Sequence, residues 1–325
     1  MRITPPPKTV CYRVAPKVNP CEHPPTSPYL IKHRMKRRSF IQKSVLTGFA
    51  SSLLPHALAM ANRTDQPLMR FGLVTYLWGK DMKLTELLEA CETAGINGVE
   101  LRTEHAHGVE PQLNQRERAE VRKRFADSPV ELVGYGSNAQ YHESDPQKVQ
   151  QNIDFTKSLI ELMHDCGGSG VKVKPNGFSK GVDPKKTIEQ IGNALNEVAE
   201  YGEGYGQQIR VEVHGKETSS LPVMRDIFQI ADHSNATICW NSNDADLDGE
   251  GLEKNFHMVQ DRFGDTVHVR ELNEGQYPYK KLFELFASAH YHGWILLEAR
   301  TNPADKVKAL IEQRKCFEDM IQNLT

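Results

Sequence analysis

The stretch RVEVHG, residues 210–215, begins like a buried strand and carries two ionisable side chains on one face. Successive side chains of a strand point to opposite sides, so Glu212 and His214 share one side and the two valines share the other. An apolar run that turns a carboxylate and an imidazole the same way either has a wet face or brings a polar pair to a place where it is needed.

The same form recurs twice further along the chain. In TVHVREL (266–272), His268 and Arg270 end an apolar run, and in WILLEAR (294–300), Glu298 ends another. Three strands therefore deliver ionisable groups from their C-terminal ends.

From Met69 onward, short apolar runs alternate with amphipathic helical stretches. The runs expected to be strands are RFGLVTY (70–76), GVELR (98–102), VELVGYG (130–136), GVKVKP (170–175), IRVEVHG (209–215), ATICWN (236–241), TVHVREL (266–272) and WILLEAR (294–300). Eight strands that alternate with helices over roughly 250 residues predict an α/β protein, a single-domain (β/α)8 TIM barrel over residues 69–325. A doubly wound open sheet is the alternative, but no glycine-rich phosphate loop follows the first strand.

In a TIM barrel, the active site lies at the C-terminal ends of the strands. Glu212, Asn241, His268 and Glu298 all occupy this rim, one on each of four consecutive predicted strands. An oxygen-rich set with one imidazole suits one divalent metal ion, Mn²⁺, Mg²⁺, Co²⁺ or Zn²⁺. Two carboxylates beside such an ion also suit proton transfer next to a carbonyl.

This strand order resembles the xylose-isomerase-like TIM barrel superfamily, the sugar phosphate isomerase/epimerase group, over nearly all of the chain from Met69 on. The resemblance implies that Glu212 and Glu298 are both metal ligands and the acid–base pair, with His268 as the imidazole ligand. Asn241 stands where the epimerase branch has Asp, so the site loses one negative charge and should bind metal more weakly. Asp244 is a possible substitute.

Four further residues near the rim are expected to contact substrate. His107 lies in the loop after the second predicted strand, and Lys174 ends the fourth, where its ammonium could stabilise an enolate oxygen. His214 and Arg270 lie one strand step beyond presumed ligands, a position suited to substrate hydroxyl groups.

The function expected from this site is sugar isomerisation or epimerisation on a sugar or related polyol. A lyase or hydratase acting on 3-keto sugars or glycosides is the first alternative, because the same groups can drive β-elimination after proton abstraction. A non-catalytic sugar-binding barrel is the second, on the strength of Asn241. DNA repair enzymes of the endonuclease-IV type resemble the fold, but the rim has too few histidines for their multi-zinc site.

The N-terminus contains segments that stand apart from the predicted barrel. Residues 1–34 are rich in proline and are expected to be an untranslated or disordered extension, with Met35 as the start. Residues 35–61 have a basic start with Arg37 and Arg38, a modest apolar stretch and small residues at the end, which resembles a twin-arginine (Tat) signal. We therefore expect the Tat export machinery as a partner and a periplasmic or exported protein.

Composition limits the remaining partners. The chain has 325 residues, 38% of them hydrophobic, and a formal net charge of -2, which gives no reason to expect a nucleic-acid partner. No apolar run reaches the roughly 20 residues of a membrane-spanning helix, so stable membrane insertion is not expected. Assembly into a homo-oligomer stays open.

Overall fold

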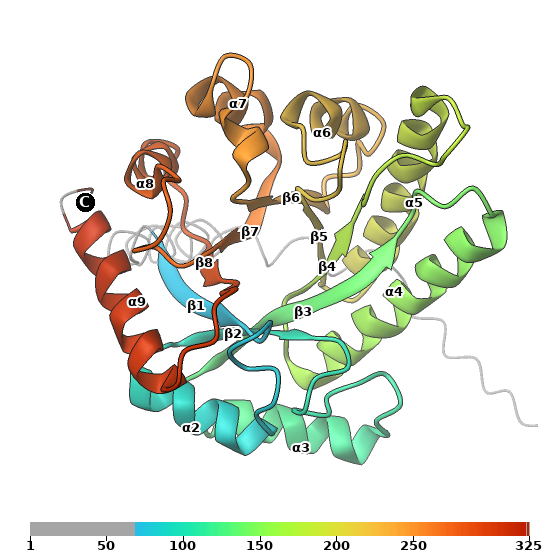
Figure 1. Ribbon diagram of the computed structural model, residues 1–325. Helices are drawn as coiled ribbons and strands as arrows, with labels where there is room; N and C mark the ends of the chain where they lie inside the picture. Colours follow the sequence, from blue (N-terminus) through green and yellow to red (C-terminus); the bar gives the residue numbers. More distant parts are fainter. Residues whose placement is uncertain (1–68, 323, 325) are drawn as a thin grey trace, which may run out of the picture. The chain divides into compact units, whose positions relative to one another are not determined.

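The computed structural model describes residues 69–322 and 324, and its eight parallel strands close into a barrel surrounded by helices (Figure 1). The strands are β1 (Arg70–Val74), β2 (Gly98–Arg102), β3 (Glu131–Gln140), β4 (Gly170–Lys174), β5 (Gln208–Glu212), β6 (Ala236–Asn241), β7 (Phe263–Val269) and β8 (Trp294–Leu297). They are ordered around the barrel as in the sequence, and β1 pairs with β8 to close it. The predicted (β/α)8 barrel is confirmed.

Helices follow the strands and cover the outside of the barrel. They are α2 (Leu84–Ala94), α3 (Gln115–Ala126), α4 (Pro146–Cys166), α5 (Pro184–Gly204), α6 (Leu221–Phe228), α7 (Leu252–Val259), α8 (Tyr279–Ser288) and α9 (Lys306–Ile321), with the short 3₁₀ helices η1 (Asp244–Leu247) and η2 (Gln260–Arg262). The residues of the expected extension and signal lie outside the described part of the chain. No helix within residues 69–322 is long and apolar enough to cross a membrane.

Local sequence signals set the ends of several helices. The Asp-Pro pairs begin α4 and α5, where Asp145 and Asp183 each accept a hydrogen bond from a backbone amide of the first turn. Gly95 ends α2 and Gly167 ends α4, both in the left-handed conformation that glycine adopts without strain. These caps set the residues at which the helices begin and end.

Several strands place charged side chains in the interior of the barrel. Glu100 of β2, Lys172 of β4 and Arg210 of β5 are fully buried. The intervening strand β3 makes room for them with glycine: a Cβ on Gly136 would lie 2.6 Å from Glu100 Oε1, and one on Gly134 would lie 2.9 Å from Arg210 Nη1. The absence of side chains at these two positions allows long charged side chains from the neighbouring strands to cross the lumen.

Candidate active site

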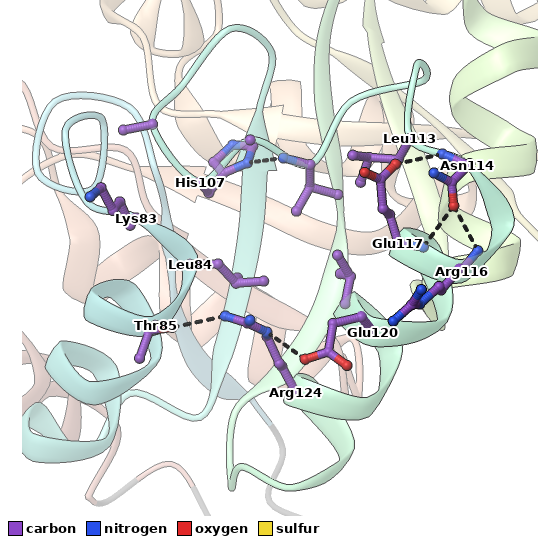
Figure 2. Close-up of a pocket in the computed structure, with 14 residues that line it drawn as sticks. Lys83, Leu84, Thr85, His107, Leu113, Asn114, Arg116, Glu117, Glu120 and Arg124 are labelled. Carbon is purple, nitrogen blue, oxygen red and sulfur yellow. Dashed lines mark hydrogen bonds and ion pairs between the residues drawn. The ribbon is translucent and has the colours of Figure 1, made fainter.

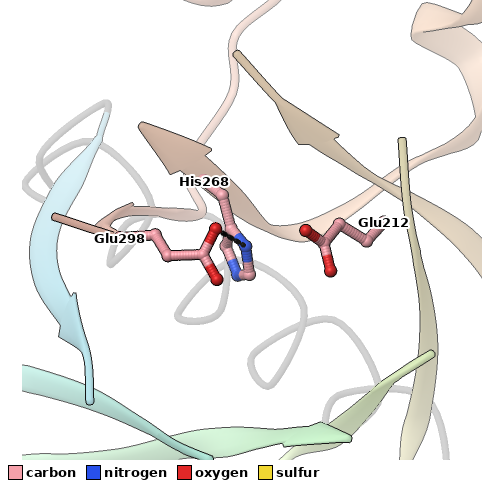
Figure 3. Close-up of side chains that lie close together, drawn as sticks. All are labelled: Glu212, His268 and Glu298. Carbon is pink, nitrogen blue, oxygen red and sulfur yellow. Dashed lines mark ion pairs between the residues drawn. The ribbon is translucent and has the colours of Figure 1, made fainter. Parts of the chain in front are cut away.

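All four predicted ligands lie at the C-terminal mouth of the barrel: three form one cluster, and Asn241 is hydrogen-bonded to Glu212 of that cluster. Glu212 ends β5, His268 lies near the end of β7, and Glu298 directly follows β8. One ligand atom from each lies within 4.8 Å of the other two, and all three residues are buried. Figure 3 shows the two glutamates on opposite sides of the His268 ring.

Both oxygens of Glu212 already accept donors from the protein. Lys172 forms a fully buried ion pair with Oε2, and Asn241 Nδ2 donates to Oε1 at 2.8 Å. Burial alone would raise the pKa of the Glu212 carboxyl, but Lys172 and then His268 outweigh burial and hold that pKa far below its usual range. Lys172 and His268 therefore favour the ionised form of Glu212. Asn241 is buried beside it with its amide nitrogen, not its oxygen, turned to Glu212.

Glu298 has a different neighbourhood. Arg102 Nη1 donates to Glu298 Oε1 at 2.9 Å, and Oε2 faces His268 Nδ1 at 3.9 Å, beyond hydrogen-bond distance. Arg102 also donates to Asn138 Oδ1 at 3.2 Å and stacks over Tyr76, with 5.4 Å from its guanidinium carbon to the ring centroid. One Glu298 oxygen is thus held in place and the other points toward the centre of the site.

His268 lies between Glu298 and a carboxylate deeper in the lumen. Its Nε2 is 3.2 Å from Glu100 Oε1, and its Nδ1 has no hydrogen-bond partner in the described part of the chain. Burial alone would lower the pKa of the fully buried imidazole, but Cys239 and Glu100 raise it well above the ordinary value. Glu100 therefore orients the ring so that Nδ1 faces the mouth.

The sequence analysis missed Glu100 and Lys172. GVELR (98–102) has the same alternation as RVEVHG, so Glu100 and Arg102 share an inward face. If Lys174 points inward, as the alternation predicts, so must Lys172 two residues earlier. The alternation of side chains along these two strands was therefore the sequence signal that could have predicted both residues.

Lys174 lies at the mouth, above Lys172. Its Nζ donates to Asn138 Oδ1 at 3.2 Å, so its partner is a neutral amide and not a carboxylate. Burial, followed by the charge of Lys172, lowers the pKa of Lys174 to about 8. This position leaves a readily deprotonated ammonium group near Glu212.

Comparison with known proteins identifies the family of this barrel. Residues 88–320 match the model of the family described as the xylose isomerase-like TIM barrel. The chain belongs to this family. No curated protein sequence matches it significantly.

Several solved structures share the fold at low sequence identity. The 3-keto-D-glucoside 4-epimerase YcjR from E. coli, in its apo form, superposes with a TM-score of 0.66 at 13% identity, over 77% of this chain and 99% of that one. An L-ribulose 3-epimerase gives a TM-score of 0.68 at 14% identity, over 79% and 95%. The IOLI protein with a binding zinc atom gives 0.67 at 13% identity, over 79% and 99%. At this identity, the likeness is one of fold.

The donor set at the mouth has the composition of a divalent metal site. Two carboxylates and an imidazole within 4.8 Å of one another suit such an ion in type. The buried Nδ1 of His268 has no hydrogen-bond partner among the described residues, and a metal would satisfy it. Glu212, His268 and Glu298 therefore fit a divalent ion. Asp244 is exposed and is not part of this cluster.

His107 is not brought to the carboxylates. Its Nε2 donates to the carbonyl oxygen of Arg102 at 2.8 Å, and its Nδ1 accepts from the Val109 amide at 3.0 Å. Burial lowers its pKa to about 4, so the ring is neutral and both nitrogens are used within its own loop. A substrate contact for His107 stays a prediction that this arrangement does not favour.

His214 and Arg270 both follow their strands but face different surroundings. His214 is half-buried, with Nδ1 2.9 Å from Asn176 Oδ1, and burial lowers its pKa even though Glu212 acts to raise it. Arg270 and Arg300 line a hollow of about 310 Å³ beside the mouth, together with Asp244. The Nε of Arg270 is buried without a hydrogen-bond partner in the described residues. Their roles as substrate contacts stay predictions.

A larger hollow, of about 850 Å³, lies outside the barrel between α2 and α3 (Figure 2). None of the clustered carboxylates lines it. Its polar side chains pair with one another: Asn114 caps α3 together with Glu117, and Arg124 bonds Thr85 and Glu120. We therefore place the chemistry at the smaller, buried cluster in the mouth, where charge and geometry converge.

Proposed function

We propose that the protein is a sugar isomerase or epimerase that transfers a proton at a carbon next to a carbonyl. The observation that carries this proposal is the pair of buried carboxylates, Glu212 and Glu298, on opposite sides of His268 at the barrel mouth. Inversion of a carbon by removal of a proton from one face and its return to the other uses two acid–base groups on opposite faces of that carbon. Family membership and the sugar epimerases among the structural neighbours support the same reaction class.

The two glutamates have unequal parts in this proposal. Glu298 Oε2 points to the centre of the site without a close donor, so it removes the proton. Glu212 is held ionised by Lys172 and is the group on the opposite face. Lys174, whose partner in the described part of the chain is the neutral amide of Asn138, donates to the oxygen that becomes negative.

A divalent metal is the cofactor proposed for this site, held by Glu212, His268 and Glu298. When bound, such an ion supplies Lewis acidity to the carbonyl oxygen of the substrate. Unphosphorylated sugars are the substrates proposed, because the sequence contains no glycine-rich phosphate loop after its first strand.

The test is solvent exchange. A panel of unphosphorylated keto-sugars and 3-keto-glucosides is incubated with the protein in D₂O, and incorporation of one deuterium is followed by mass spectrometry. The wild type should exchange, and Glu298→Gln should lower the rate by about 10²-fold or more, the usual contribution of a positioned acid–base group. The matched control is Glu274→Gln, which changes an exposed glutamate of the side hollow.

Two outcomes would refute the proposal. Absence of exchange in every sugar would favour the binding barrel, and release of an aglycone or dehydrated product would assign a lyase. Unchanged exchange in Glu298→Gln would remove that residue from the chemistry.

A further inference from the structure

Lys172 occupies a position that bears directly on metal binding. Its Cα lies level with Arg210, one layer below Glu212, and its side chain extends upward to reach Glu212 Oε2. No part of the side chain is exposed, so the ammonium group is enclosed in the lumen. This group forms an ion pair with the first of the three candidate ligands.

Asn241 acts in the same direction on the other oxygen. Its Nδ2 donates to Glu212 Oε1 at 2.8 Å, which orients the amide oxygen away from that carboxylate. A carboxylate at this position could not donate in this way and would add a negative charge. Glu212 is therefore satisfied on both oxygens by groups of the protein itself.

The charge balance of the cluster supports this view. The lumen contains three buried carboxylates, Glu100, Glu212 and Glu298. Lys172 pairs with Glu212, Arg102 pairs with Glu298, and His268 faces Glu100. Attraction for a divalent ion depends on uncompensated negative charge among its ligands. Since these carboxylates are paired with protein cations, the site attracts such an ion only weakly.

We propose that Lys172 is a resident cation of this site, and that a divalent metal binds only weakly and exchangeably because it must displace the Lys172 ammonium from Glu212. The inference rests on the proposed function in that it concerns the cofactor of the same site. Glu100 is the acceptor to which Lys172 can turn when displaced, because its Oε2 has no hydrogen-bond partner within residues 69–322, whereas its Oε1 faces His268 Nε2 at 3.2 Å. Lys172 and Asn241 thus set the metal affinity of the barrel without being ligands.

The experiment measures metal binding directly. The full chain is purified without chelator, dialysed against EDTA and then against metal-free buffer, and titrated with Mn²⁺, with free ion followed by electron paramagnetic resonance. Lys172→Met and Asn241→Asp are compared with wild type, and Lys216→Met is the matched control because that side chain is 90% exposed. Circular dichroism verifies that each variant is folded.

The wild type should retain no metal after dialysis and should bind Mn²⁺ weakly. Lys172→Met removes the competing charge, and Asn241→Asp adds a negative one, so each should bind Mn²⁺ at least about tenfold more tightly. Lys216→Met should bind as the wild type does. If Lys172→Met does not fold, Asn241→Asp tests the inference alone, since it keeps the lysine.

One equivalent of metal that survives dialysis in the wild type would overturn the inference, and so would variants that bind no more tightly. These outcomes are independent of the deuterium exchange test. A protein that exchanges deuterium and holds metal tightly refutes only the inference, whereas one that binds metal as expected and never exchanges refutes only the proposed function.

Discussion

Two lysines on β4 lie two residues apart, face the same lumen and have opposite surroundings. Lys172 is enclosed and forms an ion pair with Glu212, a carboxylate held by a second donor as well. Lys174 is at the mouth and donates to the neutral amide oxygen of Asn138. The strand and residue type are the same, and only the depth in the barrel differs.

This difference shows that the depth of a lysine in the barrel determines what its charge can interact with. A fully buried ammonium is tolerated only with a charged partner, so Lys172 is committed to Glu212. Lys174 keeps contact with solvent and has no carboxylate partner among residues 69–322, so its charge is free to meet a substrate oxygen. The four predictions below test this division, in order of decreasing effect.

The largest effect should come from Lys172→Met. Removing one partner of a buried ion pair leaves Glu212 without charge compensation, and the free energy of unfolding should fall by about 3–5 kcal/mol. Urea denaturation followed by circular dichroism measures it. The same substitution at Lys174 should cost under about 1 kcal/mol, because its partner is neutral and solvent is near; equal losses at both positions would erase the distinction.

Lys174→Met should instead affect catalysis. Loss of a donor to a developing oxyanion lowers turnover by about 10²–10³-fold, and we expect this loss in the rate of deuterium exchange while the melting temperature stays close to that of the wild type. Lys174→Arg, which keeps the positive charge, should retain part of the activity. A Lys174→Met variant with the wild-type rate would assign the lysine to the surface of the mouth.

A smaller effect is expected from removing the second member of the buried pair. Glu212→Gln in the Lys172→Met background deletes the uncompensated charge and should restore about 1–3 kcal/mol of the lost stability. Denaturant titration of the two single variants and the double variant gives the coupling energy. Additive losses would show that the two side chains do not stabilise each other.

The smallest effect is a pH dependence. Burial lowers the pKa of Lys174 to about 8 from its ordinary value of 10.5, so its ammonium form is lost above pH 8. Exchange should be level below that pH and should fall by up to about tenfold per unit above it. The effect of Lys174 on stability has the opposite sign, because the folded state binds this proton less tightly than the unfolded state does. The free energy of unfolding should therefore increase as pH rises from 8 to 10.5. The pH–rate profile of Lys174→Arg should lack the alkaline decline.

Much of this fold could be predicted from the alternation of apolar runs and helices. The period of two in RVEVHG, TVHVREL and WILLEAR also indicated which side chains face the lumen. Glu212, His268 and Glu298 do converge, and Asn241 is hydrogen-bonded to Glu212. The family assignment is confirmed. The N-terminal export signal lies outside the described residues and stays a prediction.

The pairing of those side chains could not be predicted in the same way. That Lys172 reaches up one layer to Glu212 depends on the length of its side chain and on the space left by glycine in β3, not on periodicity. That Asn241 turns its nitrogen to Glu212 depends on which acceptor lies opposite. His107 lies in a loop, where no alternation indicates the direction of a side chain, and backbone groups of Arg102 and Val109 hydrogen-bond both of its ring nitrogens.

The pairing of β1 with β8 also has a consequence for how the chain reaches its native state. Strands at the two ends of the described chain must meet before the barrel closes, and contacts of such long sequence separation form slowly. Until then, Glu212 and Lys172 remain hydrated, and the cost of removing their water falls on the closing step. An incomplete barrel would therefore be an open sheet with a hydrated interior, and pairing of its last strand, Trp294–Leu297, with β1 would close it.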